Sequence, residues 1–361
     1  MRRLPLLLAF VLAVPALVPA QEKRPLPPEQ AKAAFLKLLD RPKVPADVRE
    51  DDKPAVKGDL YYLRWSYASE RKADGTVERV PCLTVGPNAQ KEPTPVMIVL
   101  HGTGGSKEGV SSWLEAFARQ GVTGIAIDAR YHGGRSGGRV MGSAAYVAAV
   151  TKAWKTPAGQ PHEHPFYYDT VWDLWRLLDV LQTTKAIDPK RIGMMGISMG
   201  GIQTWLAASV DDRVAVAAPL IAVQSFRWSL ENDRWQGRAR TIQAAHDAAA
   251  KDLGEPAVNK RVCRELWGKV VPGITDDFDC PNLIRLFAGR PLFVGNGDKD
   301  PNCPVEGAKL AFAAAEEAYA KAGAKDRLDI WVAEGVAHKV TDEHRAAAIA
   351  FCVKWLKAER K

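Results

Sequence analysis

Features typical of several protein classes are scarce or missing from this sequence. Only five cysteines occur in 361 residues, and no two of them are spaced as C-x-x-C, so a structural zinc site is not expected. Lysine and arginine form no long run, which disfavours nucleic-acid binding despite a formal charge of +8. No internal repeat is present. With 47% hydrophobic and 25% charged residues, the composition is that of a soluble globular protein with a substantial core.

A long hydrophobic run occurs only at the N-terminus. It extends over Leu4–Val18, is interrupted by two prolines and follows the basic pair Arg2 and Arg3. Small residues precede Gln21, as at a signal-peptidase cleavage site. The run is too short and too broken by proline to span about 30 Å of hydrocarbon, which disfavours a stable membrane anchor. We therefore expect residues 1–20 to be a signal peptide, and the mature protein to be exported to the periplasm or secreted.

Export permits disulfides, but the cysteines leave two alternatives open. Cys263 and Cys280 bracket a loop-rich region and form the favoured pair. In the alternative, all five are free and mostly buried. The five are Cys82, Cys263, Cys280, Cys303 and Cys352.

Short apolar segments alternate with amphipathic segments from Gly58 onward. The former predict strands and the latter, with their 3.6-residue period, predict helices. Expected strands are 60–67, 77–85, 96–100, 122–127, 191–197, 214–219, 291–295 and 328–332, and expected helices are 28–39, 111–120, 166–182, 200–209, 238–253, 307–322 and 341–356. This order predicts an α/β fold with a doubly wound, mostly parallel sheet.

The alternation stops over residues 221–290, which are polar and irregular. We expect this stretch to be a helical insertion, or lid, over one end of the sheet and before the strand at 291–295. Residues 21–55 are rich in Pro, Lys and Asp and are expected to be an N-terminal extension. Residues 56–361 then form one α/β domain.

The most specific motif is Gly196-Ile197-Ser198-Met199-Gly200, which fits G-x-S-x-G between an expected strand and an expected helix. A serine on such a sharp turn has a strained backbone and little room around it, and the flanking glycines relieve the crowding. The helix that follows favours negative charge near its N-terminus. Ser198 is therefore the candidate nucleophile.

A glycine-rich turn, His101-Gly102-Thr103-Gly104-Gly105, directly follows the buried strand at 96–100. Acyl transfer creates an oxyanion that needs preorganised N–H donors. We expect these donors to be the backbone N–H of Met199 and that of Gly102 or Thr103. His101 is expected to buttress the turn rather than to act as a base.

A serine hydroxyl needs a base, and the base needs an orienting acid, in the chain order Ser, Asp, His. Asp298 and Asp300 both follow the strand at 291–295, and Asp300 is preferred because prolines stiffen its loop. His338 follows the strand at 328–332 and is the candidate base. The pair His162 and His164 has no third ligand, so no metal and no organic cofactor is expected.

Together these residues resemble the α/β-hydrolase superfamily, and more narrowly the dienelactone-hydrolase, acetyl-xylan-esterase and prolyl-oligopeptidase-type catalytic domains. The resemblance covers about residues 58–358. It rests on H-G-T-G-G at His101, the run Ile187–Gly201, the run Arg290–Pro304, and G-V-A-H at His338. Its roles map onto Ser198, Asp300 and His338. The sequence departs at Thr103, where acetyl-xylan esterases often carry Tyr.

The resemblance implies hydrolysis of carboxylic esters through an acyl-enzyme. The expected partner is a small-molecule ester, such as a sugar ester, or a short peptide, and no nucleic acid; the oligomeric state is left open. Fewer than about forty mature residues precede the first expected strand, which leaves no room for the β-propeller of dipeptidyl peptidases. An oligopeptidase-type peptidase without a propeller is therefore the second hypothesis. A non-catalytic binding protein on a hydrolase scaffold is the third.

Overall fold

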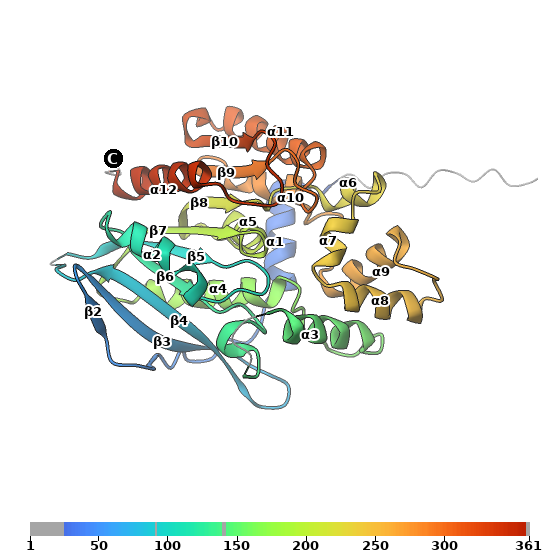
Figure 1. Ribbon diagram of the computed structural model, residues 1–361, viewed down its shortest axis with the longest axis horizontal. Helices are drawn as coiled ribbons and strands as arrows, with labels where there is room; N and C mark the ends of the chain where they lie inside the picture. Colours follow the sequence, from blue (N-terminus) through green and yellow to red (C-terminus); the bar gives the residue numbers. More distant parts are fainter. Residues whose placement is uncertain (1–24, 91, 139–141, 359–361) are drawn as a thin grey trace, which may run out of the picture.

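The computed structural model describes residues 25–90, 92–138 and 142–358. The expected signal peptide lies outside these residues. Within them the strands form one ten-stranded sheet, in the order β1-β3-β4-β6-β5-β7-β8-β9-β10 with β2 paired to β3 (Figure 1). The strands are β1 (Arg49–Glu50), β2 (Ala55–Lys57), β3 (Leu60–Arg71), β4 (Val77–Pro87), β5 (Thr94–Leu100), β6 (Thr123–Ile127), β7 (Ile187–Ile197), β8 (Val214–Leu220), β9 (Leu292–Gly297) and β10 (Leu328–Ala333).

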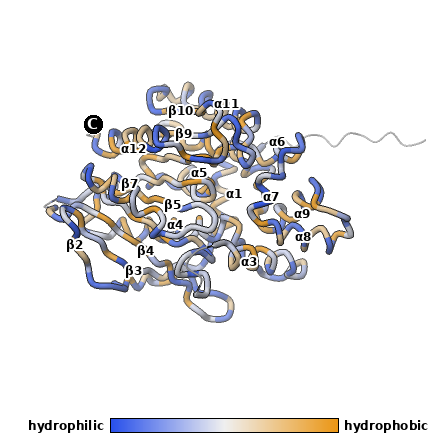
Figure 2. The backbone as a smooth tube through the Cα atoms, viewed as in Figure 1, coloured by the Kyte–Doolittle hydropathy of each residue, from blue (hydrophilic) through white to orange (hydrophobic). Residues whose placement is uncertain are grey.

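The part of the sheet from β6 to β10 is parallel, and β3 and β4 join it as an antiparallel edge. This confirms the doubly wound, mostly parallel sheet expected from the sequence. The central strands β5 and β8 are buried along almost their whole length because helices cover both faces. Figure 2 shows hydrophobic colouring along these strands and hydrophilic stretches on the outer loops.

Two layers of helices enclose the sheet. The helices α2 and α12 share one hydrophobic cluster with one face, whereas α4, α5, α10 and α11 share another with the opposite face. The helices are α1 (Pro28–Leu38), α2 (Ser111–Ala118), α3 (Ala144–Lys155), α4 (Tyr168–Leu181), α5 (Met199–Val210), α6 (Phe226–Glu231), α7 (Gln236–Arg240), α8 (Gln243–Asp252), α9 (Lys260–Val270), α10 (Cys280–Ile284), α11 (Val305–Lys321) and α12 (Asp342–Lys357).

Helices α6 to α10 lie between β8 and β9 in the chain and correspond to the expected insertion. The stretch is not irregular: its short helices bury apolar side chains, with α8 and α9 packed against α3 and α10 packed against α5 and α11. In Figure 1 helices α6 to α9 stand beside the sheet together with α3. Whether this layer acts as a lid stays a prediction.

One expectation inside the insertion is wrong. A single helix over 238–253 was expected, but the chain forms α7 and α8 with a break at Ile242, whose φ of −137° and ψ of 44° are not helical. The break directs the side chain of Ile242 toward the hydrophobic core, where it is fully buried. Burial of one apolar side chain thus overrides the helical pattern.

The N-terminal extension packs onto the domain. Helix α1 buries Phe35 among the rings of Tyr168, Trp175 and Phe278, with centroids 5.1–6.1 Å apart. The strands β1 and β2 then pair with β3. The extension therefore completes both a helical layer and the edge of the sheet.

All five cysteines are free and buried, so the favoured pairing of Cys263 with Cys280 is not formed. Each of these two thiols sits in the buried face of a short helix, α9 or α10, that packs against other elements. The structure therefore agrees with the alternative expectation, in which all five cysteines are free and mostly buried. They serve as small apolar side chains. Among the described residues, no helix is long and apolar enough to cross a membrane.

Candidate active site

Ser198 lies at the turn between β7 and α5. Its backbone has φ 55° and ψ −113°, a conformation that L residues rarely adopt. The flanking glycines are required by close packing. A Cβ on Gly196 would lie 2.3 Å from the carbonyl carbon and oxygen of Gly200, and a Cβ on Gly200 would lie 2.5 Å from the carbonyl oxygen of Leu100. The G-x-S-x-G pattern therefore has a steric origin in this fold.

His338 lies in the loop after β10. Its Nε2 is 2.8 Å from the Oγ of Ser198, and its Nδ1 is 2.7 Å from an Oδ2 of Asp300. A carboxylate only accepts hydrogen bonds, so Nδ1 carries the proton and Nε2 accepts the hydroxyl proton of Ser198. The tautomer that the site needs is thus fixed by the carboxylate.

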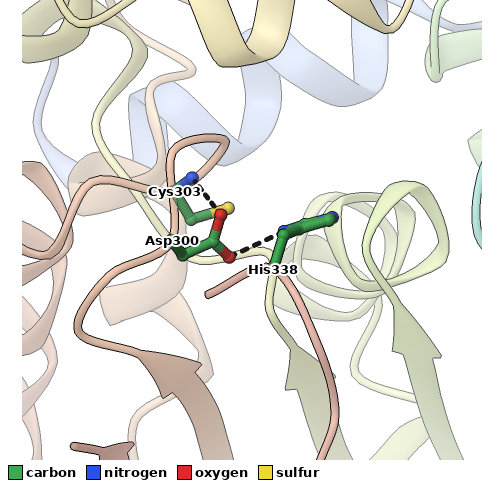
Figure 3. A group of neighbouring side chains, drawn as sticks. All are labelled: Asp300, Cys303 and His338. Carbon is green, nitrogen blue, oxygen red and sulfur yellow. Dashed lines mark hydrogen bonds and ion pairs between the residues drawn. The ribbon is translucent and has the colours of Figure 1, made fainter. Parts of the chain in front are cut away.

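Asp300 follows β9, and its side chain is almost fully buried. Its Oδ1 accepts hydrogen bonds from the backbone N–H of Asn302 at 2.8 Å and of Cys303 at 3.1 Å, while its Oδ2 faces His338 (Figure 3). Three donors therefore hold this carboxylate. Asp298, the alternative acid, instead lies 3.7 Å from the Nζ of Lys299.

The loops that carry the acid and the imidazole are tied together. The backbone N–H of Asp298 donates to Ala333 at 3.0 Å, and that of Lys299 donates to Val336 at 2.9 Å. A Cβ on Gly297 would lie 2.2 Å from the carbonyl oxygen of Val336. The two loops are therefore packed backbone to backbone beside Ser198.

The glycine turn after β5 passes beside the serine. A Cβ on Gly102 would lie 3.4 Å from the carbonyl oxygen of Ile197 and 3.6 Å from the Cβ of Ser198. The amide of Met199 is at the first position of α5, where no intrahelical acceptor exists. These two residues are thus near Ser198. The roles of Met199, Gly102 and Thr103 as oxyanion donors stay predictions.

His101 holds this turn in place, as expected. Its Nδ1 is 2.8 Å from the carbonyl oxygen of Gly102, and its Nε2 accepts the backbone N–H of Ala129 at 3.1 Å. Burial lowers the pKa of His101, which keeps the ring neutral. A neutral ring is the form that makes both hydrogen bonds.

Of the other histidines, none takes the place of His338. The rings of His162 and His164 lie 4.7 Å apart and face backbone carbonyls of Lys269 and Val270, and no metal-ligating group of three forms around them among the described residues. His246 is buried in α8 and accepts from Trp267. These three histidines thus contact backbone carbonyls or a neighbouring ring and lie away from the hydroxyl of Ser198.

The segment Asp128–Arg135 is structural. Arg130 and Arg135 both bind the buried carboxylate of Asp173 at 2.8 Å, and Arg130 also binds Glu70 at 2.7 Å. These charges join β3, α4 and the loop after β6. The segment therefore stabilises the wall behind the glycine turn.

Two residues near the acid were not anticipated. Arg238 of α7 is almost fully buried, and its Nη2 donates to the carbonyl oxygen of Asn302 at 3.1 Å and to the Sγ of Cys303 at 3.3 Å. No sequence signal links residues 65 positions apart in this way. A cavity of about 410 Å³ lies between α7 and the loop of Asp300, which lines it together with Pro301.

A larger cavity of about 530 Å³ lies elsewhere, between the N-terminal extension, β3 and α3. It is lined by charged residues of both signs, including Arg41, Lys72, Glu163 and Asp169. Neither Ser198 nor His338 lines it. The hydrogen-bonding contacts among Ser198, His338 and Asp300 indicate an active site more strongly than the volume of a cavity does. We therefore place the site at Ser198.

Comparisons with known proteins identify a family and a fold that this chain shares. A family model for acetyl xylan esterase (AXE1) matches residues 46–227, just over half of the chain. YtaP of Bacillus subtilis, a protein named as a hydrolase, is 27% identical over 186 residues, which make up 52% of this chain and 53% of that protein. The chain thus spans about half the length of the curated relatives it matches.

Two solved esterases share the fold. Acetyl xylan esterase 1 of Thermoanaerobacterium is 18% identical with a TM-score of 0.66, covering 92% of this chain and 95% of that one. The glucuronoyl esterase of Solibacter usitatus is 15% identical with a TM-score of 0.60, covering 90% and 92%. Identities this low show the α/β-hydrolase fold alone. Taken with the family match, they show that this chain belongs to the acetyl xylan esterase family within the α/β-hydrolase superfamily.

Proposed function

We propose that the protein is an exported serine esterase that cleaves carboxylic esters through an acyl-enzyme. Ser198 is the nucleophile, His338 the base and Asp300 the acid that orients it. One observation carries the proposal: the unbroken chain of contacts from the Oγ of Ser198 through His338 to Asp300, at 2.8 and 2.7 Å. Distances of this kind allow a proton to pass as the bond to the substrate forms.

The reaction proceeds in two halves. The Oγ of Ser198 attacks the ester carbonyl while Nε2 of His338 takes the hydroxyl proton, and the protonated imidazole then gives that proton to the leaving alcohol. Water next attacks the acyl-serine, with His338 again as base, and releases the acid. Asp300 keeps Nδ1 protonated and stabilises the imidazolium in both halves.

The tetrahedral intermediate carries an oxyanion beside Ser198. The backbone N–H of Met199 and that of Gly102 or Thr103 are the proposed donors. Support comes from the position of Met199 at the start of α5 and from the approach of Gly102 to Ser198. Each such donor contributes on the order of 3 kcal/mol to transition-state stabilisation.

The proposed substrates are short acyl esters of sugars. Support comes from the family, whose name specifies acetyl xylan, and from the shared fold with an acetyl xylan esterase and a glucuronoyl esterase. Thr103 stands where a Tyr is common in acetyl-xylan esterases, so the acyl group and the sugar are to be determined by assay. No step of the proposed reaction uses a metal or a cofactor.

A kinetic screen tests the activity. Purified protein is assayed on aryl esters of increasing acyl length, acetylated xylo-oligosaccharides, methyl glucuronate esters and peptide anilides. We expect short acyl esters to be turned over and Ser198→Ala to lower kcat by about 10⁴-fold or more. The exposed Ser112→Ala in α2 serves as the control and should keep full activity. Full activity of Ser198→Ala would overturn the proposal, and faster cleavage of peptide anilides than of esters would favour a peptidase.

Export is the second part of the proposal. It is supported by the basic, apolar and small-residue regions of residues 1–20. Expression of the full chain followed by cell fractionation and N-terminal sequencing should find a protein that begins at Gln21 outside the cytoplasm. A protein that retains Leu4–Val18 and stays in the cytoplasm would contradict this part without affecting the catalytic proposal.

A further inference from the structure

A thiol lies beside the proposed catalytic acid and base. Asp300, Cys303 and His338 offer an oxygen, a sulfur and a nitrogen whose positions all lie within 4.8 Å of one another. Figure 3 shows that Asp300 and Cys303 come from one loop and that His338 reaches them from another. The proposed reaction does not use the side chain of Cys303.

These three atoms form a ligand set that soft divalent cations prefer. Zinc binds thiolate at about 2.3 Å, imidazole nitrogen at about 2.0–2.1 Å and carboxylate oxygen at about 2.0–2.2 Å, in tetrahedral geometry. Tetrahedral geometry separates such atoms by about 3.3 Å or more. The 2.7 Å contact between His338 and Asp300 therefore has to open by a fraction of an ångström.

The surroundings suit a thiolate at this position. The Sγ of Cys303 donates to the carbonyl oxygen of Ile221 at 3.3 Å and accepts from Arg238 at 3.3 Å. Arg238 is almost fully buried, and its Nε lacks a hydrogen-bond partner. Burial raises the pKa of the Cys303 thiol, so the sulfur stays protonated until a metal displaces the proton. The thiolate then adds a negative charge within 3.3 Å of the Arg238 guanidinium.

We propose that Asp300, Cys303 and His338 form an inhibitory site for a soft divalent cation such as Cd²⁺ or Zn²⁺. The effect on activity rests on the proposed esterase function, but the binding does not. The metal takes the lone pair of Nδ1, so the ring proton moves from Nδ1 to Nε2. The thiol proton is released to solvent. With Nε2 protonated, His338 has no lone pair to accept the proton of Ser198.

The cavity of about 410 Å³ reaches the site on the side of Asp300, the one proposed ligand that lines it. It is lined by Asp300 and Pro301 on one side and by Gly237 and Arg240 of α7 on the other. Water fills any remaining coordination position of the metal. Because metal bound to Nδ1 leaves Nε2 of His338 protonated, a molecule that holds the metal cannot pass the proton of Ser198 to His338.

The experiment titrates the mature full chain with Cd²⁺ and follows two readouts. The ultraviolet charge-transfer absorbance of a cadmium–thiolate bond reports binding, and ester hydrolysis reports inhibition relative to each variant's own metal-free rate. The variants are Cys303→Ala and Cys303→Ser. The matched control is Cys352→Ala, which removes a buried thiol from α12.

We expect wild type and Cys352→Ala to show the absorbance band and to be inhibited, with recovery on adding EDTA. Both Cys303 variants should lose the band, and their half-inhibiting Cd²⁺ concentration should rise by about tenfold or more. An unchanged band or unchanged inhibition in both variants, or binding without inhibition of an active enzyme, would overturn the proposal. If no variant hydrolyses esters even without metal, the proposed function fails, while the absorbance titration still decides the metal site.

Discussion

At the scale of single residues, the turn at Ser198 concentrates unusual backbone geometry. A non-glycine residue with φ 55° and ψ −113° costs on the order of 1–3 kcal/mol and persists only when its surroundings enforce it. Here the N–H of Ser198 donates to the carbonyl oxygen of Leu220 at 2.9 Å, and α5 begins immediately afterwards. These constraints direct the hydroxyl toward His338, so the strain and the reactive contact have the same origin.

Replacing the buried acid tests its role at this scale. We predict that Asp300→Asn lowers kcat by about 10³–10⁴-fold with little change in folding, because an amide allows the wrong imidazole tautomer. Asp298→Asn is the matched control, since its side chain faces Lys299 and leaves His338 untouched. Steady-state ester hydrolysis and circular dichroism measure both effects. Equal losses in the two variants would contradict the assignment of Asp300.

At the scale of elements, α7 of the insertion supports the loop of Asp300, the proposed catalytic acid. A Cβ on Gly237 would lie 2.1 Å from the carbonyl oxygen of Pro301, so the helix touches this loop backbone to backbone. Arg238 donates to the next residue of the loop, Asn302. The insertion therefore forms a fixed wall of the site at this point.

Glycine substitutions test this contact. We predict that Gly237→Ala displaces the acid loop and lowers kcat by about tenfold or more, since displacements near 1 Å cost up to about 10²-fold. Gly268→Ala in α9 is the control, because no atom lies within 4 Å of its added Cβ. Ester hydrolysis and thermal unfolding are measured for both. An unchanged kcat in Gly237→Ala would show that α7 does not position the acid.

The buried charges of Arg130, Arg135 and Asp173 join β3, α4 and the loop after β6. Opposite charges hold the pKa of Asp173 well below its usual range, with Arg130 the largest favourable influence against burial. We predict that Asp173→Asn lowers the free energy of unfolding by about 3–5 kcal/mol, because two buried guanidinium groups each lose one of their carboxylate partners and Asp173 is the buried one they share.

Asp179→Asn is the control for this substitution. Asp179 lies on the same helix but is partly exposed, so its ion pairs contribute about 1 kcal/mol or less. Urea unfolding at neutral pH measures both variants. A loss in Asp173→Asn no larger than that in Asp179→Asn would rule out a stabilising role for the buried cluster.

Some of these elements could be predicted from sequence because their signals are local. The apolar run at 96–100 and the motif around Ser198 each specify a strand end and a turn, and the expected α5 and α12 begin within two residues of the observed helices. The order Ser198, Asp300, His338 is the one expected of this fold, and each of the three residues follows an expected strand. Parallel strands then bring these residues to one edge of the sheet.

Other features depend on contacts between distant segments and could not be predicted. The break at Ile242 follows from burial against the core, and the helices α6 and α10 are too short for a periodic pattern to emerge. Helix α9 does carry such a pattern, because Val262, Leu266 and Val270 recur on its buried face, and this signal was missed. The contact of Arg238 with Cys303 has no signature in composition or spacing. Tertiary packing rather than local propensity determines these parts.

At the scale of the whole molecule, buried neutral histidines couple stability to pH. Burial lowers the pKa of His132 and His246 to about 4 from 6.5. The unfolded chain binds protons near pH 6.5, whereas the folded protein does not until about pH 4. The stabilising contribution of each neutral histidine is therefore present above about pH 6.5 and is lost as the pH falls toward 4, on the order of 2–3 kcal/mol each.

Urea unfolding at several pH values between 7.5 and 4.5 tests this coupling. Asp279, whose pKa burial raises to about 6, acts in the opposite direction, so the test compares wild type with a histidine variant. In His246→Gln, the glutamine amide can still accept the hydrogen bond from Trp267. As the pH falls, the free energy of unfolding of this variant should decrease less than that of wild type, by the contribution of one buried histidine. An equal change of stability with pH in wild type and His246→Gln would contradict the burial of a neutral ring at His246.

The central claim concerns the reactivity of one hydroxyl, and covalent labelling measures it most directly. The folded protein is treated with a fluorophosphonate, digested, and mapped by mass spectrometry, with Ser198→Ala and His338→Gln alongside. The account predicts a single adduct on Ser198 in wild type, none in Ser198→Ala and a much slower reaction in His338→Gln. An adduct on another residue, or esterase activity in a protein whose Ser198 stays unlabelled, would contradict it.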